Sequence, residues 1–316
     1  MSDKKVLIIG SAGFVGNHLI DYILANRKDW QITATKMPKE VIDKPVDVRD
    51  LDITKPEEID ALLSDVQPDY IFHLAAQSSV ALSWKNPQLT ININIVGTVN
   101  LLDAVRKLEK KPRMLLIGSG EEYGHVKPEE VPIKEDNNTR PGNIYAVTKV
   151  TQNMIGRLYF EAYGMEIMST RSFNHTGPNQ APQFVVPDFC KQVADIERGK
   201  KEPVIYTGNL SAKRDFTDVR DVVRAYCLLM EKGRAGETYN VGCGKAIEVS
   251  AILDMILSHS EMDIRVETDP AKLRPVDVPI IEADISKLKE DTGWTPEISL
   301  DQTITETLEA YRNSVE

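Results

Sequence analysis

The sequence is poor in the residues on which disulfide-rich, metal-binding and membrane-spanning proteins depend. Its three cysteines, Cys190, Cys227 and Cys243, are too few and too scattered for a disulfide framework or a zinc site. No apolar run approaches the ~20 residues of a membrane span, and the segment 1–5 shows no signal-peptide pattern. We therefore expect a cytoplasmic protein that has no bound metal and does not contact a membrane.

Positive charge is also sparse. The chain has 38 Lys and Arg against 48 Asp and Glu, a net charge of −10, and it has no extended basic stretch. A nucleic-acid backbone requires a clustered cationic surface, so nucleic acid is not expected as a partner. A small phosphorylated ligand needs only one or two local cations and stays compatible with this composition.

A glycine-rich turn follows the first apolar run of the chain. The run Val6–Ile9 reads as a strand, and apolar residues after the turn recur at helical spacing. Glycines in such a turn permit close approach of a pyrophosphate, and the helix N-terminus presents free N–H groups to it. The spacing is Gly-x-x-Gly-x-x-Gly rather than the commoner dinucleotide fingerprint. The residues expected to bind the cofactor here are Gly10, Ser11, Ala12, Gly13, Phe14, Val15 and Gly16.

The second strand indicates which dinucleotide is bound. The segment 31–35 reads as that strand, and an NAD site would place an acidic residue near its end to accept from the ribose 2′-OH. Lys36 stands there instead, with Lys39 close behind. A cation suits a 2′-phosphate, so NADP is favoured and NAD stays an alternative; equally, both lysines could be solvated loop charges.

Apolar segments alternate with helical ones through the first half of the chain. The segments 70–74, 114–117 and 167–170 read as buried parallel strands. This alternation is typical of a doubly wound parallel α/β sheet of the Rossmann type, which binds ligands at the carboxyl ends of its strands. We expect this domain over 1–175, rejoined by about 221–243, and a smaller C-terminal α/β domain, mainly for substrate binding, over 176–316. Three residues that follow the strand at 70–74 are assigned to the cofactor, namely Leu74, Ala75 and Ala76.

Tyr145 and Lys149 lie four residues apart, and Ser119 follows an earlier strand. Positions i and i+4 share one face of a helix, so the ammonium can lie near the phenol. A fixed positive charge favours the phenolate, so Lys149 is expected to lower the pKa of Tyr145. Ser119 could then hold a substrate oxygen against the phenol. The bland alternative for Tyr-x-x-x-Lys alone is a solvated helix face.

Several ordered motifs together resemble a known family. The segments 10–16, 73–76, 94–98 and 119–124, with Tyr145 and Lys149, are similar to those of extended short-chain dehydrogenases/reductases that modify nucleotide sugars. The resemblance runs from residue 4 to about Trp294. The segments 171–178 and 211–219 resemble those of GDP-6-deoxy-4-keto-mannose reductases and, less closely, of GDP-mannose 4,6-dehydratases.

The resemblance implies a role for each matching residue. Tyr145 would protonate the C4 oxygen of a keto sugar, Ser119 would polarise the carbonyl, and Lys149 would hold the nicotinamide ribose of NADPH. A GDP-sugar would be the substrate, in a homodimer. The residues it assigns to the adenine of the cofactor are Asp52 and Ile53. Those assigned to the substrate, besides Ser119, are Gln77, Glu121, Asn174, Val185, Lys191, Arg214, Arg274 and Asp277.

Alternatives remain at four positions. Glu121 matches the base of the 4,6-dehydratases, so a dehydratase is the second reading, beside a 4-epimerase and an inactive nucleotide-binding regulator. Glu122 is expected to be solvated, and His73 to be a hydrogen-bonded core residue. The amphipathic segment 91–105 is expected to be a helix, either at a dimer interface or on an ordinary core face.

Overall fold

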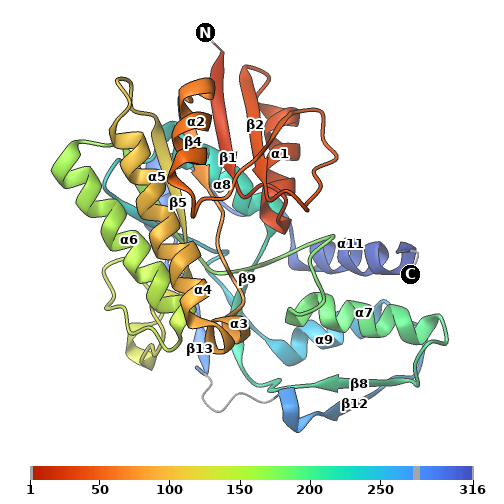
Figure 1. Cartoon of the computed structure of the whole chain (residues 1–316). Coiled ribbons are helices and arrows are strands. Elements are labelled where there is room, and N and C mark those ends of the chain that lie inside the picture. The colour runs from red at the N-terminus through yellow and green to blue at the C-terminus, as the bar shows by residue number, and fades with distance from the viewer. Residues whose placement is uncertain (1–2, 273–277, 315–316) are drawn as a thin grey trace.

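A parallel sheet forms the centre of the protein (Figure 1). The computed structural model describes residues 3–272 and 278–314. Seven strands of these residues pair in the order β10-β6-β5-β4-β1-β2-β3, and every pair is parallel. They are β1 (Lys4–Ile9), β2 (Trp30–Lys36), β3 (Asp47–Asp50), β4 (Tyr70–His73), β5 (Arg113–Ser119), β6 (Ile167–Ser172) and β10 (Thr238–Val241). The predicted doubly wound α/β class is confirmed.

Helices cover both faces of this sheet. One face carries α1 (Phe14–Asn26) and α8 (Val219–Lys232), and the other carries α2 (Pro56–Val66), α5 (Gly97–Arg106) and α6 (Ile144–Tyr163). Successive residues of β1 enter the two cores in turn, because side chains alternate across a strand. Val6 and Ile8 join the first core, and Leu7 and Ile9 join the second. Each such fully buried side chain contributes roughly 1.5–3 kcal/mol, which explains why these strands read as continuous apolar runs.

The segment that follows β4 is helical but not uniformly α-helical. It comprises α3 (Val80–Lys85), α4 (Pro87–Ile91), a π-helical turn (Asn92–Val96) and then α5. The predicted helix over 91–105 is therefore confirmed, with the π turn inside it. Asn94 lies in that turn and is fully buried, and its amide donates to Gln77 O at 3.0 Å and to Thr148 Oγ1 at 2.9 Å. π turns inside α-helices often occur at functional sites.

The remaining elements form a smaller part beside the carboxyl ends of the strands (Figure 1). Helices α7 (Val185–Glu197), α9 (Val249–Ser258) and α11 (Leu300–Asn313) share a third core. Strand β9 (Lys213–Asp218) pairs in parallel with β7 (Asn174–Thr176) and β13 (Ile280–Ile281), and antiparallel with β11 (Ala246–Glu248). A further parallel pair joins β8 (Val204–Thr207) and β12 (Arg265–Thr268).

The chain returns to the central sheet late in the sequence. We expected this return near residues 221–243, and α8 and β10 occupy residues 219–241 against and within the sheet. Helix α10 (Ser286–Thr292) contributes Leu288 to the core beneath α8. Three short 3-10 turns complete the description, at Gly120–Glu122, Pro128–Glu130 and Pro270–Lys272. Within residues 3–272 and 278–314, no helix combines the length and the apolarity needed to cross a membrane.

Candidate active site

The glycine turn between β1 and α1 leaves room for an anion. Gly10 has a φ of +86°, and a Cβ added there would lie 2.6 Å from the backbone of Ala75, so the turn requires glycine. A Cβ on Gly13 would meet nothing closer than 3.8 Å, which leaves the space in front of it open. Helix α1 begins with neither a side-chain cap nor an acidic residue in its first turn. Its first N–H groups are therefore available to a phosphate, and the turn fits the pyrophosphate of a dinucleotide.

The side chains of this turn have structural roles. Ser11 is fully buried: its hydroxyl donates to Ile8 O at 2.7 Å and accepts from Thr35 N at 3.2 Å, so only its backbone can face a ligand. Ala12 and Val15 pack against the first core, and a Cβ on Gly16 would lie 2.4 Å from Ser11 O. The ring of Phe14 lies parallel to that of His175, with centroids 6.4 Å apart.

Lys36 ends β2 beside this turn, where we expected it. Its ammonium lies 2.5 Å from the Asp50 carboxylate at the end of β3. After β3, Asp52 accepts from the backbone and the hydroxyl of Thr54, at 3.0 and 2.7 Å. Ile53 is buried, and a Cβ on Gly97 would lie 2.7 Å from its Cδ1. These contacts place Ile53 in the packing between the loop and α5.

The residues after β4 lie against the glycine turn. The N–H groups of Leu74 and Ala75 both donate to Ile9 O at 2.9 Å, and Ala76 follows them, partly exposed. His73 itself is buried, and its Nε2 lies 3.0 Å from Thr98 Oγ1. Burial lowers the pKa of His73 to about 3, with a further contribution from the charge of Lys149. The expectation that His73 is a hydrogen-bonded core residue is confirmed.

Ser119, Tyr145 and Lys149 converge at the ends of β5 and α6. Asn143 caps α6, because its side chain accepts from Ala146 N at 2.8 Å. Tyr145 follows in the first turn of that helix, and its phenol lies close enough to the Ser119 hydroxyl for that group to influence its pKa. Lys149 is 3% exposed and donates to Ile117 O at 2.7 Å and to Gln152 Oε1 at 3.1 Å.

The pKa shifts of Tyr145 and Lys149 differ from the expectation. Burial raises the pKa of Tyr145 well above its ordinary value, and the neighbouring Ser119 hydroxyl opposes that shift. Burial also lowers the pKa of Lys149 to about 8, against an opposing contribution from Glu122. The prediction that Lys149 lowers the pKa of Tyr145 is therefore wrong for this state, because loss of solvation dominates. With a raised pKa, the phenol carries its proton at neutral pH.

Glu122, the residue beside Glu121, was misjudged from the sequence. The expectation of a solvated side chain is wrong, because Glu122 is 0% exposed. Its carboxylate accepts from Ser119 N at 3.0 Å, from Asn153 Nδ2 at 2.6 Å and from Arg171 Nε at 3.0 Å. Burial raises the pKa of Glu122, and Arg171 opposes that shift. Glu122 thus joins the backbone of Ser119 to α6 and to the end of β6.

Glu121, the adjacent carboxylate, is partly buried and faces the start of α6. Its Oε2 accepts from Asn143 Nδ2 at 3.0 Å, so Asn143 both caps α6 and orients Glu121. Asn143 was also missed, and the available signal was an Asn directly before a helical pattern. Across the described residues, no group of three or more His, Cys, Asp and Glu side chains is placed to hold a metal ion.

The residues assigned to the substrate are dispersed. Gln77 is buried and donates to Ser79 O and Thr90 Oγ1, so its amide stabilises the loop after β4. Asn174 is exposed on β7, and Arg214, on the neighbouring strand β9, donates to Lys213 O. Val185 begins α7, where Lys191 forms an ion pair with Asp195 at 2.9 Å. Arg274 and Asp277 lie outside the described residues.

The family model described as GDP-mannose 4,6 dehydratase matches residues 7–307. The chain belongs to this family, which confirms the resemblance drawn from its motifs. Among relatives, the GDP-6-deoxy-D-mannose reductase of Pseudomonas aeruginosa is 30% identical over 99% of this chain and 98% of its own length. A GDP-mannose 4,6-dehydratase of Yersinia enterocolitica is also 30% identical, over 95% of this chain and 91% of that protein.

Solved structures also match almost the whole chain. The structure of RMD from Pseudomonas aeruginosa complexed with NADPH has a TM-score of 0.89 and 29% identity, and the match covers 99% of this chain and 100% of that chain. A UDP-glucose 4-epimerase of Thermus thermophilus in complex with NAD has a TM-score of 0.87 and 26% identity, over 98% and 100% of the two chains. The fold is therefore shared by proteins crystallised with either dinucleotide.

Proposed function

We propose that the protein reduces the C4 keto group of GDP-4-dehydro-6-deoxy-D-mannose to give GDP-D-rhamnose, with NADPH as the reductant. The observation that carries this proposal is the position of Ser119, at the end of β5, close to the buried Tyr145 phenol in the first turn of α6. Reduction of a ketone requires a proton donor at the carbonyl oxygen, and this pair supplies one. The similarity to the reductase of Pseudomonas aeruginosa supports the choice of substrate and cofactor.

The residues of the site divide the work between binding and proton transfer. The N–H groups after Gly13 and the ammonium of Lys36 would hold NADPH, which, when bound, supplies the hydride. Ser119 donates a hydrogen bond to the C4 oxygen, and Tyr145 delivers its proton to the same oxygen as negative charge develops there. The Lys149 ammonium lies one helical turn after Tyr145 and is held by Ile117 O and Gln152.

A test of this function supplies the two sugar nucleotides separately. GDP-4-dehydro-6-deoxy-D-mannose should cause the absorbance of NADPH to fall, with GDP-D-rhamnose identified as the product by NMR. GDP-mannose alone should leave NADPH unchanged and yield no product. Formation of a keto sugar from GDP-mannose without net consumption of the cofactor would overturn the proposal.

The second candidate is a GDP-mannose 4,6-dehydratase. It is favoured by one observation, the orientation of the Glu121 carboxylate by Asn143 at 3.0 Å. An oriented carboxylate could remove a proton from the sugar in an elimination. We prefer the reductase because the acid that reduction needs, Tyr145, is in place. Elimination also requires a second protein group that acts as acid or base next to the sugar. A Glu121→Gln variant that keeps the reduction rate supports this preference.

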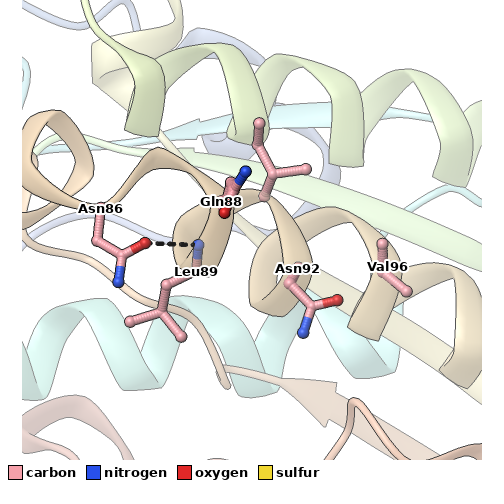
Figure 2. A pocket seen from close by; sticks show the side chains of 6 residues that line it. Asn86, Gln88, Leu89, Asn92 and Val96 are labelled. Atoms are coloured by element: carbon pink, nitrogen blue, oxygen red, sulfur yellow. Dashed lines mark hydrogen bonds between the residues drawn. The ribbon is translucent and has the colours of Figure 1, made fainter.

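A homodimer is the proposed assembly. Helix α6 exposes three apolar side chains on one face, those of Val147, Met154 and Leu158. Helix α4 and the π turn lie beside α6 and expose Leu89, Ile91 and Val96. Figure 2 shows several of the side chains that line a hollow on this surface, which is formed by Asn86, Gln88, Leu89, Ile91, Asn92 and Val96. Exposed apolar patches of this kind mark association surfaces.

The assembly can be tested with one charge on this face. Met154→Glu should convert a dimer to a monomer in analytical ultracentrifugation. Met262→Glu is the matched control, because Met262 is also an exposed methionine but lies in the smaller part of the chain. A wild-type protein that sediments as a monomer would contradict the dimer.

The three cysteines are free, which fits the predicted reducing compartment, the cytoplasm.

A further inference from the structure

Lys36 and Asp50 form an ion pair at the carboxyl edge of the sheet. They end the neighbouring strands β2 and β3 in register, and Lys36 Nζ lies 2.5 Å from Asp50 Oδ1. The Lys36 side chain is 18% exposed and that of Asp50 is 57% exposed. The N–H of Leu51 also donates to Lys36 O at 2.9 Å, which keeps the two strand ends together. The ammonium is thus held on one side by a carboxylate that solvent can reach.

This pair lies next to the glycine turn. Thr35, the residue before Lys36, accepts from Gly10 N through its hydroxyl at 3.2 Å. Its carbonyl oxygen accepts from Ser11 N at 2.8 Å. Lys36, the next residue on β2, therefore lies close to the turn that fits the pyrophosphate. In parallel α/β folds this strand end faces the adenosine ribose, and a cation there accommodates a 2′-phosphate.

A second carboxylate lies close to the same place. Glu40 Oε2 accepts from the N–H of Met37 at 2.9 Å, one residue after Lys36. Arg49 pairs instead with Asp47 at 2.9 Å and with Asp65 at 3.3 Å. The positive charge of Lys36 is accordingly opposed by Asp50 and, at longer range, by Glu40. A 2′-phosphate approaching Lys36 meets both the ammonium and its carboxylate partner.

We propose that Asp50 is a specificity-determining residue, whose carboxylate competes with the 2′-phosphate of NADP for the Lys36 ammonium and so limits the preference for NADP over NAD. The inference rests on the proposed use of a nicotinamide dinucleotide. Binding of NADP requires Lys36 to exchange a partner it already has, and it brings a phosphate dianion close to Asp50. Binding of NAD leaves the ion pair intact. The ion pair therefore weakens the binding only of the cofactor that carries the extra phosphate.

A competing role for the same contact is that Asp50 orients Lys36 toward the phosphate and so strengthens binding of the phosphate. The two effects give opposite signs when the charge of Asp50 is removed and its shape is kept. Asp50→Asn retains an oxygen that accepts from Lys36 and removes the repulsion. Under the proposal it strengthens binding of a 2′-phosphate, and under the orienting role it weakens that binding.

Isothermal titration of the full chain with adenosine 2′,5′-bisphosphate and with adenosine 5′-monophosphate separates these effects without any sugar substrate. Asp50→Asn should bind the bisphosphate about 1.5-fold to fivefold more tightly, the range that corresponds to releasing an exposed ion pair. Its affinity for the monophosphate should stay unchanged. The gain should shrink as salt is raised, since exposed charges are screened.

Two further variants complete the test. Lys36→Ala should bind the two nucleotides with nearly equal affinity. Asp60→Asn is the matched control: Asp60, on α2, forms an exposed pair at 3.1 Å with Lys107, the residue after α5, and the variant loses the same charge. Asp60→Asn should leave the ratio of the two affinities at the wild-type value.

An unchanged or lowered ratio in Asp50→Asn overturns the inference, as does a Lys36→Ala variant that keeps the wild-type ratio. A wild-type chain that binds neither nucleotide overturns it together with the cofactor site. The outcome is independent of the sugar: if the affinities shift as expected and the keto sugar is not reduced, only the proposed function fails. If the keto sugar is reduced and the ratio does not move, only the inference about Asp50 fails.

Discussion

Glu122 accepts a hydrogen bond from the backbone N–H of Ser119 at 3.0 Å, across the 3-10 turn that begins after Ser119 and ends at Glu122. The same carboxylate holds Arg171, whose Nη1 donates to Glu135 O at 2.9 Å. Glu135 in turn accepts from the N–H of Asn240 at 2.8 Å. The position of Ser119 is therefore linked to β6 and β10 through a chain of polar contacts.

Removal of the Glu122 charge should destabilise the fold. Glu122→Gln leaves the guanidinium of Arg171, which is only 12% exposed, without its carboxylate. Loss of one partner of a buried ion pair costs about 3–5 kcal/mol, so the free energy of unfolding in urea should fall by roughly that amount. Glu129→Gln is the control, because Glu129 is an exposed glutamate of the nearby 3-10 turn. Equal stabilities of the two variants would show that the Glu122 contacts contribute little.

Loss of the Tyr145 hydroxyl should abolish proton donation and leave the cofactor site intact. Tyr145→Phe should lower turnover with the keto sugar by about 10²–10⁴-fold, the usual contribution of a general acid. NADPH should bind as in the wild type, as followed by its fluorescence. Tyr163→Phe removes a phenol from the exposed end of the same helix and should keep full activity. Unchanged turnover in Tyr145→Phe would show that a group other than Tyr145 donates the proton.

Lys149 should give the stability a specific pH dependence. Its pKa is about 8 in the folded protein against an ordinary value of 10.5, so between these values the unfolded chain binds a proton that the folded chain has released. Stability from this residue therefore rises as the pH increases through that window. Urea unfolding of the wild type and of Lys149→Met should show the wild type gaining stability relative to the variant between about pH 8 and 10.5. A constant difference across that window would contradict the burial of a titrating ammonium.

Two glycines with positive φ should respond differently to the same substitution. Gly164 ends α6 with a φ of +63°, and a Cβ there would meet no atom within 4 Å. Gly164→Ala should cost only the left-handed backbone strain, about 1–2 kcal/mol. Gly10→Ala adds a contact of 2.6 Å with the backbone of Ala75, so it should cost more and also weaken NADPH binding. Thermal unfolding measures both costs, and equal losses would contradict the close approach at Gly10.

The part of the site that could be predicted from sequence consists of local patterns. The strand, turn and helix over 4–26 are contiguous, and Tyr145 and Lys149 are related by helical spacing alone. Their pKa values could not be predicted, because desolvation depends on the packing of β5 and α6 around them. Glu122 was misjudged for the same reason: its partner Arg171 lies 49 residues away, and no local pattern joins them.

The partner of Lys36 illustrates the same limit. A lysine at the end of β2 was recognised from its position, whereas its pairing with Asp50 depends on the register between β2 and β3. An irregular loop joins β2 to β3, so the sequence between them does not specify which residues of the two strands pair. The second sheet was likewise beyond prediction, because β9 gathers partners from residues 174–176, 246–248 and 280–281.

The π-helical turn at Asn94 connects the surface of the protein with α6, the helix that carries Tyr145 and Lys149. One amide joins the backbone of Gln77, beside the glycine turn, to the hydroxyl of Thr148, the neighbour of Lys149. The same turn carries Val96 on the proposed dimer face (Figure 2). Because one buried amide holds both segments, the loop after β4 and the first turns of α6 are fixed relative to each other through a turn that also reaches the surface.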